Sequence, residues 1–175
     1  MDGSRVETQR EIEEELSQHF SGILKEDGGD RSRAINMITD LIPRTVTKEN
    51  NEMQLVKLVS MQEVEEVIHQ KAPGKAPGPN GFNSNFFHNF RDLVKEEVLE
   101  IVEESRNKRG VLKDFNATFV ILVTKEVGVD IHDKFRPIAL CNVIYKIISK
   151  VIANHLKPLL LRLIIPEQYG FVEER

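Results

Sequence analysis

Metal-ligating side chains crowd together in a short stretch that contains Asp130, His132 and Asp133. Carboxylates from separate strands can hold two divalent metal ions about 4 Å apart, an arrangement that activates a hydroxyl group for attack on a phosphate. These two aspartates, however, lie in one predicted turn without a third acidic partner, and a lone histidine beside them lacks the spacing of a metal site. We therefore predict no catalytic residue and no metal site here.

Positive charge offers a second kind of chemistry, although the whole chain carries a net charge of −4. Residues 1–70 hold 8 basic and 15 acidic residues, whereas residues 71–175 hold 16 and 13. Between Ser105 and Ile165 the basic excess is larger, with 11 basic and 4 acidic residues. Such a local excess attracts phosphate groups, so the second half of the chain is compatible with a nucleic-acid partner.

A loop rich in proline and glycine runs from Lys71 to Phe82 and holds three residues of each type. Proline and glycine at this density exclude a regular element, so the segment is predicted to be a loop of fixed shape. Its backbone N–H groups can meet a phosphate, as in other glycine-rich loops, although the Gly-Lys-Ser/Thr of a P-loop is missing. A rigid connector that aims the following helix is an equally good interpretation.

The elements that position these residues follow from hydrophobic periodicity. Apolar residues at spacings of three and four predict helices, and the apolar run at 117–124 predicts a strand that is covered on both faces. Ser60 and Glu63 have the spacing of a capping box, which marks a helix start. The pattern predicts a mostly helical α+β fold with a short β-hairpin or small sheet. The predicted helices cover residues 7–26, 35–42, 61–70, 86–109 and 143–165, and the predicted strands cover residues 117–124 and 135–140.

The sequence shows no sign of a membrane span or of secretion. It has no apolar run of about eighteen residues, and its first twenty residues are too charged for a signal peptide. The single cysteine, Cys141, has no partner for an internal disulfide, which fits a reducing compartment. We therefore expect a cytoplasmic or nuclear protein that is not secreted and has no membrane partner.

Four segments in series carry a family resemblance. They are the loop GKAPGPNGF at 74–82, the strand and hinge at 116–125, the segment FRPIALCNVIYKIISK at 135–150, and PEQYGFVEER at 166–175. Together they resemble the N-terminal half of the reverse transcriptase, an RNA-directed DNA polymerase, of non-LTR (LINE-like) retrotransposons. The resemblance implies a partial reverse transcriptase domain at 60–175, an incomplete fingers subdomain of a right-hand polymerase, after an acidic helical linker region at 1–59.

The same resemblance implies what this chain lacks and what it contacts. In the family, the metal-binding aspartates of the palm lie downstream of the segment that matches 170–175, so this chain is expected to be truncated before them and inactive alone. No cofactor is expected for this chain, and Mg²⁺ only for a complete family member. The implied partners are an RNA and DNA primer–template, a dNTP and the missing palm region.

The resemblance also assigns roles to individual residues. A basic residue that ends the first fingers strand and an arginine that starts the next hold the triphosphate of the incoming nucleotide, and Lys125 and Arg136 stand there. Their chemistry fits, because an ammonium is a compact charge and a guanidinium is a planar fork for phosphate oxygens. Without the resemblance both are ordinary surface charges. The candidate template contacts are Lys75, Gly78, Lys146, Lys150, Gln168, Phe171 and Arg175.

Several positions depart from the family pattern, which fits either a divergent lineage or a decaying genomic copy. Three interpretations of function stay open: an inactive polymerase fragment that retains nucleic-acid contacts, an incomplete gene model of an active enzyme, and a helical protein-interaction module. The last predicts no affinity for RNA. The departures are Asn80 for the usual Asp, Phe90 for a Trp, Thr124 for a Pro, His155 for an Arg and Glu174 for a Gly.

Overall fold

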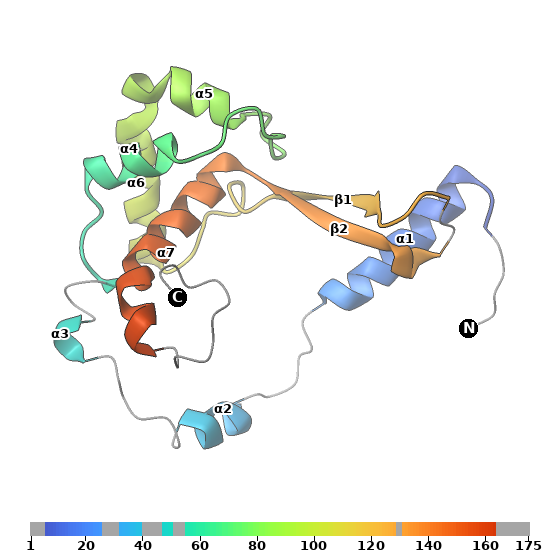
Figure 1. Cartoon of the computed structure of the whole chain (residues 1–175), viewed down its shortest axis with the longest axis horizontal. Helices are drawn as coiled ribbons and strands as arrows, with labels where there is room; N and C mark the ends of the chain where they lie inside the picture. The colour runs from blue at the N-terminus through green and yellow to red at the C-terminus, as the bar shows by residue number, and fades with distance from the viewer. Residues whose placement is uncertain (1–5, 26–31, 40–46, 51–54, 129–130, 164–175) are drawn as a thin grey trace. The chain divides into compact units, whose positions relative to one another are not determined.

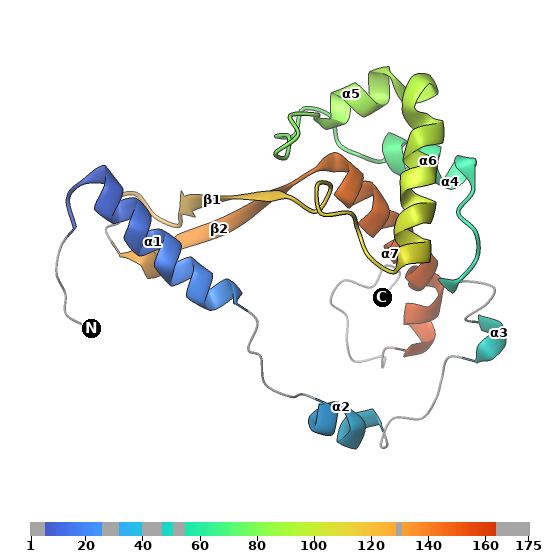
Figure 2. The ribbon, with the colours of Figure 1, turned by 180° about the vertical axis from the view of Figure 1, so that it is seen from behind.

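The chain forms helices and a small two-stranded sheet, which confirms the predicted α+β class. The computed structural model describes residues 6–25, 32–39, 47–50, 55–128 and 131–163. Figures 1 and 2 show the elements from opposite sides. None of the described helices is long and apolar enough to cross a membrane. The elements are α1 (Gln9–Leu24), α2 (Ser32–Thr39), α3 (Lys48–Asn50), α4 (Met61–His69), α5 (Ser84–Asn89), α6 (Arg91–Lys108), β1 (Thr118–Thr124), the 3-10 turn η2 (His132–Lys134), β2 (Phe135–Cys141) and α7 (Val143–Leu163).

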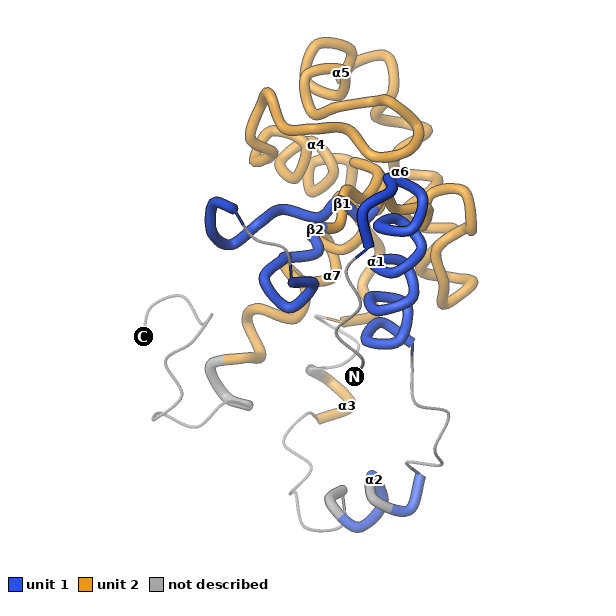
Figure 3. Tube along the Cα trace, turned by 90° about the vertical axis from the view of Figure 1, so that its right-hand side faces the viewer, with its two compact units in different colours: residues 1–42, 120–138 blue, residues 43–119, 139–175 orange. Residues whose placement is uncertain are grey.

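The chain divides into two compact units, which Figure 3 colours separately. Unit 1 holds residues 1–42 and 120–138, and so includes α1, α2 and most of the β-hairpin. Unit 2 holds residues 43–119 and 139–175, and includes α4 to α7. The boundary predicted at residue 60 concerns which residues belong to a polymerase domain. The two compact units do not test that question, so the boundary stays a prediction.

In unit 1, α1 follows the predicted helix closely. A capping box starts it, because the Glu11 N–H donates to Thr8 Oγ1 at 3.3 Å while the Thr8 N–H donates to Glu11 Oε2 at 3.2 Å. Phe20 is the buried residue of its narrow apolar stripe, at 7% exposure. The second helix, α2, begins earlier than predicted, and residues 40–42 of the predicted helix lie outside the described residues.

The core of unit 2 forms where α4, α6 and α7 pack together. The predicted capping box starts α4, with the Glu63 N–H donating to Ser60 Oγ at 3.2 Å and the Ser60 N–H to Glu63 Oε2 at 3.2 Å. Each helix buries apolar residues at spacings of three and four. Full burial of such a side chain stabilises a fold by roughly 1.5–3 kcal/mol. The buried residues include Val64, Val67 and Ile68 of α4, Val98 and Val102 of α6, and Ile144, Ile147, Ile148 and Val151 of α7.

The single long helix predicted at 86–109 is wrong, because the chain breaks at Phe90 into α5 and α6. The backbone of Phe90 has φ −110° and ψ 21°, outside the helical region, and its N–H ends α5 by donating to the Phe86 carbonyl at 3.0 Å. Its carbonyl starts α6 by accepting from the Val94 N–H at 3.1 Å. A break of one residue leaves the apolar period almost in phase, so periodicity does not reveal it. The predicted end before Gly110 is confirmed, with Arg109 as a left-handed cap at φ 55°.

The β-hairpin confirms the two predicted strands but not the burial that was predicted for the first of them. The Lys125 N–H donates to the Lys134 carbonyl at 2.8 Å, which fixes the register of the antiparallel pair. The strand predicted to be covered on both faces is instead exposed, with Phe119 at 55%, Val120 at 47% and Val123 at 43% exposure. A two-stranded sheet lacks further strands, and within the described residues no element covers these side chains enough to bury them.

Candidate nucleic-acid interface

The predicted loop at 71–82 is held in place by Asn142, the residue just before α7. Asn142 is 1% exposed, and its side-chain oxygen accepts a hydrogen bond from the Asn80 N–H at 3.1 Å. Its amide nitrogen lies 3.1 Å from the Asp114 carbonyl and 3.3 Å from the Phe115 carbonyl and donates to both. One buried side chain therefore joins the loop, the segment before β1 and the start of α7, as a satisfied polar group in a core must.

Gly78 packs closely against Cys141 and Asn142, the two residues just before α7. A Cβ atom at this position would stand 2.6 Å from the Cys141 carbonyl carbon and closer still to Asn142, so only glycine fits. Gly74 and Gly81 adopt positive φ values of 71° and 78°, a conformation that glycine takes without strain. The loop contains no helix or strand, as its composition predicts. Of the two candidate template contacts in it, Gly78 is buried in packing, whereas Lys75 is exposed.

Three lysines gather beside this loop in unit 2: Lys71, Lys146 and Lys150, which we call the lysine cluster. Lys146 and Lys150 are one turn apart on α7, and the Lys71 ammonium donates to the Lys146 carbonyl at 2.9 Å. Partial burial lowers the pKa of Lys71, and the positive charges of Lys150 and Lys146 lower it further. Within the described residues, none of the three ammonium groups lies within 4.0 Å of a carboxylate.

The predicted triphosphate pair, Lys125 and Arg136, lies on the β-hairpin in unit 1. Lys125 directly follows β1, and Arg136 is the second residue of β2. Lys134 is paired with Glu126 at 2.9 Å. The Lys125 ammonium donates to the Asp133 carbonyl at 2.7 Å, and the Arg136 side chain is exposed. Both residues are exposed near the turn of the hairpin, and their role as a pair stays a prediction.

Sequence reasoning found part of this arrangement and missed the rest. Spacing alone places Lys146 and Lys150 on one helix face. Lys71 was not singled out, because the contact that joins it to the helix spans 75 residues and leaves no local signal. The role of the Asn142 side chain in holding the loop was also missed, because its bond to Asn80 joins residues that lie 62 positions apart. The candidates Gln168, Phe171 and Arg175 lie outside the described residues.

Comparison with known proteins gives one distant relative. No family model matches the chain. The chain is 24% identical over 123 residues to the protein named transposon TX1 uncharacterized 149 kDa protein, from Xenopus laevis. The match covers 70% of this chain and 9% of that protein, so the chain spans less than a tenth of its relative. This chain is therefore distantly similar to a transposon-encoded protein.

Proposed function

We propose that this chain is part of a retrotransposon reverse transcriptase, namely its fingers portion, and that it contacts the phosphates of an RNA/DNA primer–template. The distant similarity to a transposon-encoded protein supports this origin. The lysine cluster is the observation that supports the phosphate contact. We assign no catalytic residue within the chain, so its role in this proposal is to hold nucleic acid for a palm elsewhere.

The electrostatics of the lysine cluster favour an anionic ligand. Lys71, Lys146 and Lys150 repel one another, and partial burial raises the cost of the charge on Lys71. This arrangement of like charges is unfavourable by itself, but a phosphate group that binds near it attracts all three lysines and offsets their mutual repulsion. Each phosphate that a lysine neutralises also releases condensed counterions, which strengthens binding at low salt. The cluster is therefore better explained by a phosphate ligand than by the stability of the fold.

The hairpin pair extends the proposal to the incoming nucleotide. Lys125 and Arg136 are both exposed near the turn of the hairpin, where this proposal places the triphosphate. An ammonium has three donors, and the Lys125 ammonium uses one on the Asp133 carbonyl. In this proposal the remaining donors and the guanidinium of Arg136 bind phosphate oxygens. The double variant Lys125→Ala, Arg136→Ala should weaken binding of a fluorescent dNTP to the full chain, and unchanged binding would remove this pair from the proposal.

The test of the phosphate contact is fluorescence anisotropy with a labelled RNA/DNA primer–template across a salt series. The double variant Lys146→Gln, Lys150→Gln should bind more weakly, and the slope of log K against log salt should fall by roughly 1.5 to 2 because two phosphate contacts are lost. The matched control is Lys108→Gln, Lys113→Gln, which removes the same charge outside the cluster. An equal loss of affinity in the two double variants would show that only the net charge of the chain matters, which would contradict the proposal.

Lys71 provides a second readout that separates a functional role from a structural one. Lys71→Met removes the partly buried charge and its repulsion from the other two lysines. The unfolding free energy should stay the same or rise by up to about 1 kcal/mol, since solvent screens a half-buried charge. Affinity for the primer–template should fall in the same variant. A variant that loses stability and keeps its affinity would show that Lys71 serves the fold.

A further inference from the structure

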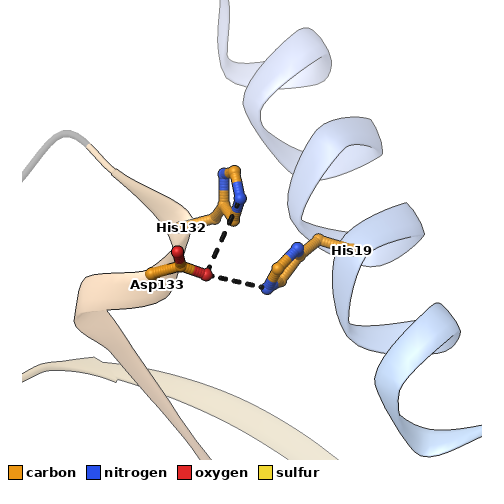
Figure 4. Close-up of side chains that lie close together, drawn as sticks. All are labelled: His19, His132 and Asp133. Carbon is orange, nitrogen blue, oxygen red and sulfur yellow. Dashed lines mark ion pairs between the residues drawn. The ribbon is translucent and has the colours of Figure 1, made fainter. Parts of the chain in front are cut away.

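Two histidines and an aspartate converge within unit 1, as Figure 4 shows. His19 comes from α1, and His132 and Asp133 come from η2 at the turn of the hairpin. The imidazole rings of His19 and His132 lie 4.0 Å apart between centroids. The Nε2 atoms of His19 and His132 lie 3.6 and 3.8 Å from the same Asp133 oxygen, Oδ1. One ligand atom from each residue falls within 4.8 Å of the others.

These separations suit shared coordination better than direct hydrogen bonding. A hydrogen bond from an imidazole N–H to a carboxylate oxygen measures about 2.7–3.2 Å, so 3.6 and 3.8 Å are too long. Two ligand atoms about 2.0–2.1 Å from one tetrahedral ion lie roughly 3.3 Å apart, which small side-chain rotations can reach from here. We propose that His19, His132 and Asp133 form a binding site for a divalent transition-metal ion of the zinc class.

The donor set defines the class of ion. Two imidazole nitrogens and one carboxylate oxygen suit Zn²⁺ and its neighbours in the transition series, whereas Ca²⁺ and Mg²⁺ prefer sites made of oxygen atoms. Three protein ligands leave a fourth tetrahedral position for water. Asp133 is exposed and the two histidines are partly buried, so solvent can reach the site.

The backbone around the site is already organised. The Lys134 N–H donates to the Ile131 carbonyl at 3.0 Å and closes η2. On the other strand, the Lys125 N–H and ammonium donate to the carbonyls of Lys134 and Asp133 at 2.8 and 2.7 Å. These bonds hold the two ligands of the turn in place. His19 packs edge-on against the neighbouring Phe20, whose buried ring anchors α1 in unit 1.

A bound ion would join α1 to the turn of the hairpin and fix their mutual geometry. His19 stands far upstream of the other two ligands in the sequence, so the ion would close a long loop of the chain. The prediction of no metal site rested on the lack of a third acidic partner for Asp130 and Asp133 and on the spacing of a lone histidine, His132, beside them. The structure supplies a third ligand from a distant helix, while Asp130 lies outside the described residues. The site is independent of phosphate binding by the lysine cluster.

The test is a Zn²⁺ titration of the full, tag-free chain in competition with a chromophoric chelator, paired with the visible spectrum of the Co²⁺ form. We expect one ion per chain, and a loss of affinity of more than about tenfold in each of His19→Ala, His132→Ala and Asp133→Asn. His69→Ala and Cys141→Ser remove other metal-binding groups and should keep wild-type affinity. The same ion should raise the thermal midpoint of the wild type and of both controls, but not of the three ligand variants.

Two outcomes would overturn the metal proposal. The first is a wild-type chain that binds no Zn²⁺ at micromolar concentrations while circular dichroism shows that it is folded. The second is an unchanged affinity for Zn²⁺ in His19→Ala, because His19 is the ligand that reaches the site only when the chain is folded. A loss of Zn²⁺ affinity in folded His19→Ala, with normal affinity in His69→Ala, supports the site whether or not the chain binds nucleic acid.

Discussion

A Cβ atom on Gly78 would stand 2.4 Å from the backbone nitrogen of Asn142 and 2.6 Å from its side-chain oxygen. The backbone of the loop therefore packs directly against the backbone of Asn142, just before α7. The hydrogen bond between the Asn142 side chain and the loop depends on this close packing. We expect Gly78→Ala to reduce the free energy of unfolding by about 1–3 kcal/mol, because backbone atoms must shift to admit the methyl group. Urea unfolding followed by circular dichroism measures the effect.

Gly110→Ala is the matched control for Gly78→Ala. A Cβ atom at Gly110 would meet nothing within 4 Å, so this substitution should change stability by less than about 1 kcal/mol and can even stabilise the chain. Equal destabilisation by the two alanines would mean that the loop does not approach Asn142 this closely in solution.

The helices of this fold could be predicted from the sequence because their signals are local. A capping box and apolar spacing mark α4, and apolar spacing alone marks α1. The break at Phe90 could not be predicted, since the apolar period continues across it. The exposure of β1 could not be predicted either. An apolar strand indicates that burial would be favourable, but it does not show that another part of the chain covers the strand.

The candidate sites divide in the same way. Helical spacing places Lys146 and Lys150 on one face of α7, so this pair could be predicted from the sequence, whereas Lys125 and Arg136 were singled out by the family resemblance alone. The contact of Lys71 with α7, and that of His19 with the hairpin turn, depend on how distant segments pack. No spacing rule within one segment encodes such contacts, which is why these two residues were missed.

The contact of the Glu63 carboxylate with His155 and Lys57 predicts a pH-dependent contribution to stability. Glu63 Oε1 lies 2.8 Å from His155 Nε2 and 3.0 Å from the Lys57 ammonium. Burial raises the pKa of Glu63, but bonds from the Ser60 N–H, Lys57 and His155 outweigh burial and hold the pKa below 4.5. The folded state thus favours the carboxylate, so its contribution is complete above about pH 4.5 and is lost as the pH falls through the lower folded value.

Glu63→Gln isolates this contribution, since glutamine keeps the capping-box geometry and removes the charge. We expect it to lower the unfolding free energy by about 1–2 kcal/mol at pH 7, with the difference from wild type shrinking below pH 4.5. Urea unfolding at several pH values measures this difference. Glu96→Gln removes an exposed carboxylate and should give no comparable pH-dependent loss. A constant deficit for Glu63→Gln from pH 7 to pH 3 would show that the charge is not what stabilises this contact.

The exposed apolar strand β1 predicts association rather than instability. Phe119 and Val120 are about half exposed, and exposed apolar residues beside unpaired strand edges promote contacts between chains. The double variant Phe119→Thr, Val120→Thr keeps β-propensity and removes apolar surface, so light scattering should show less aggregation at equal concentration. Its unfolding free energy should change by less than about 1 kcal/mol, because these side chains are already partly hydrated.

Val64→Thr is the control for the β1 double variant, because it changes a buried residue instead of exposed ones. Val64 lies in α4 and is 0% exposed in the core of unit 2. Placing a hydroxyl group there should cost about 1–3 kcal/mol of unfolding free energy without reducing aggregation. If the β1 double variant proved as destabilised as Val64→Thr in a folded, monodisperse sample, then β1 would be buried in solution, and a covering surface would have to be present. A small change in stability together with reduced scattering would instead show that β1 is an uncovered strand, as the exposure of Phe119 and Val120 indicates.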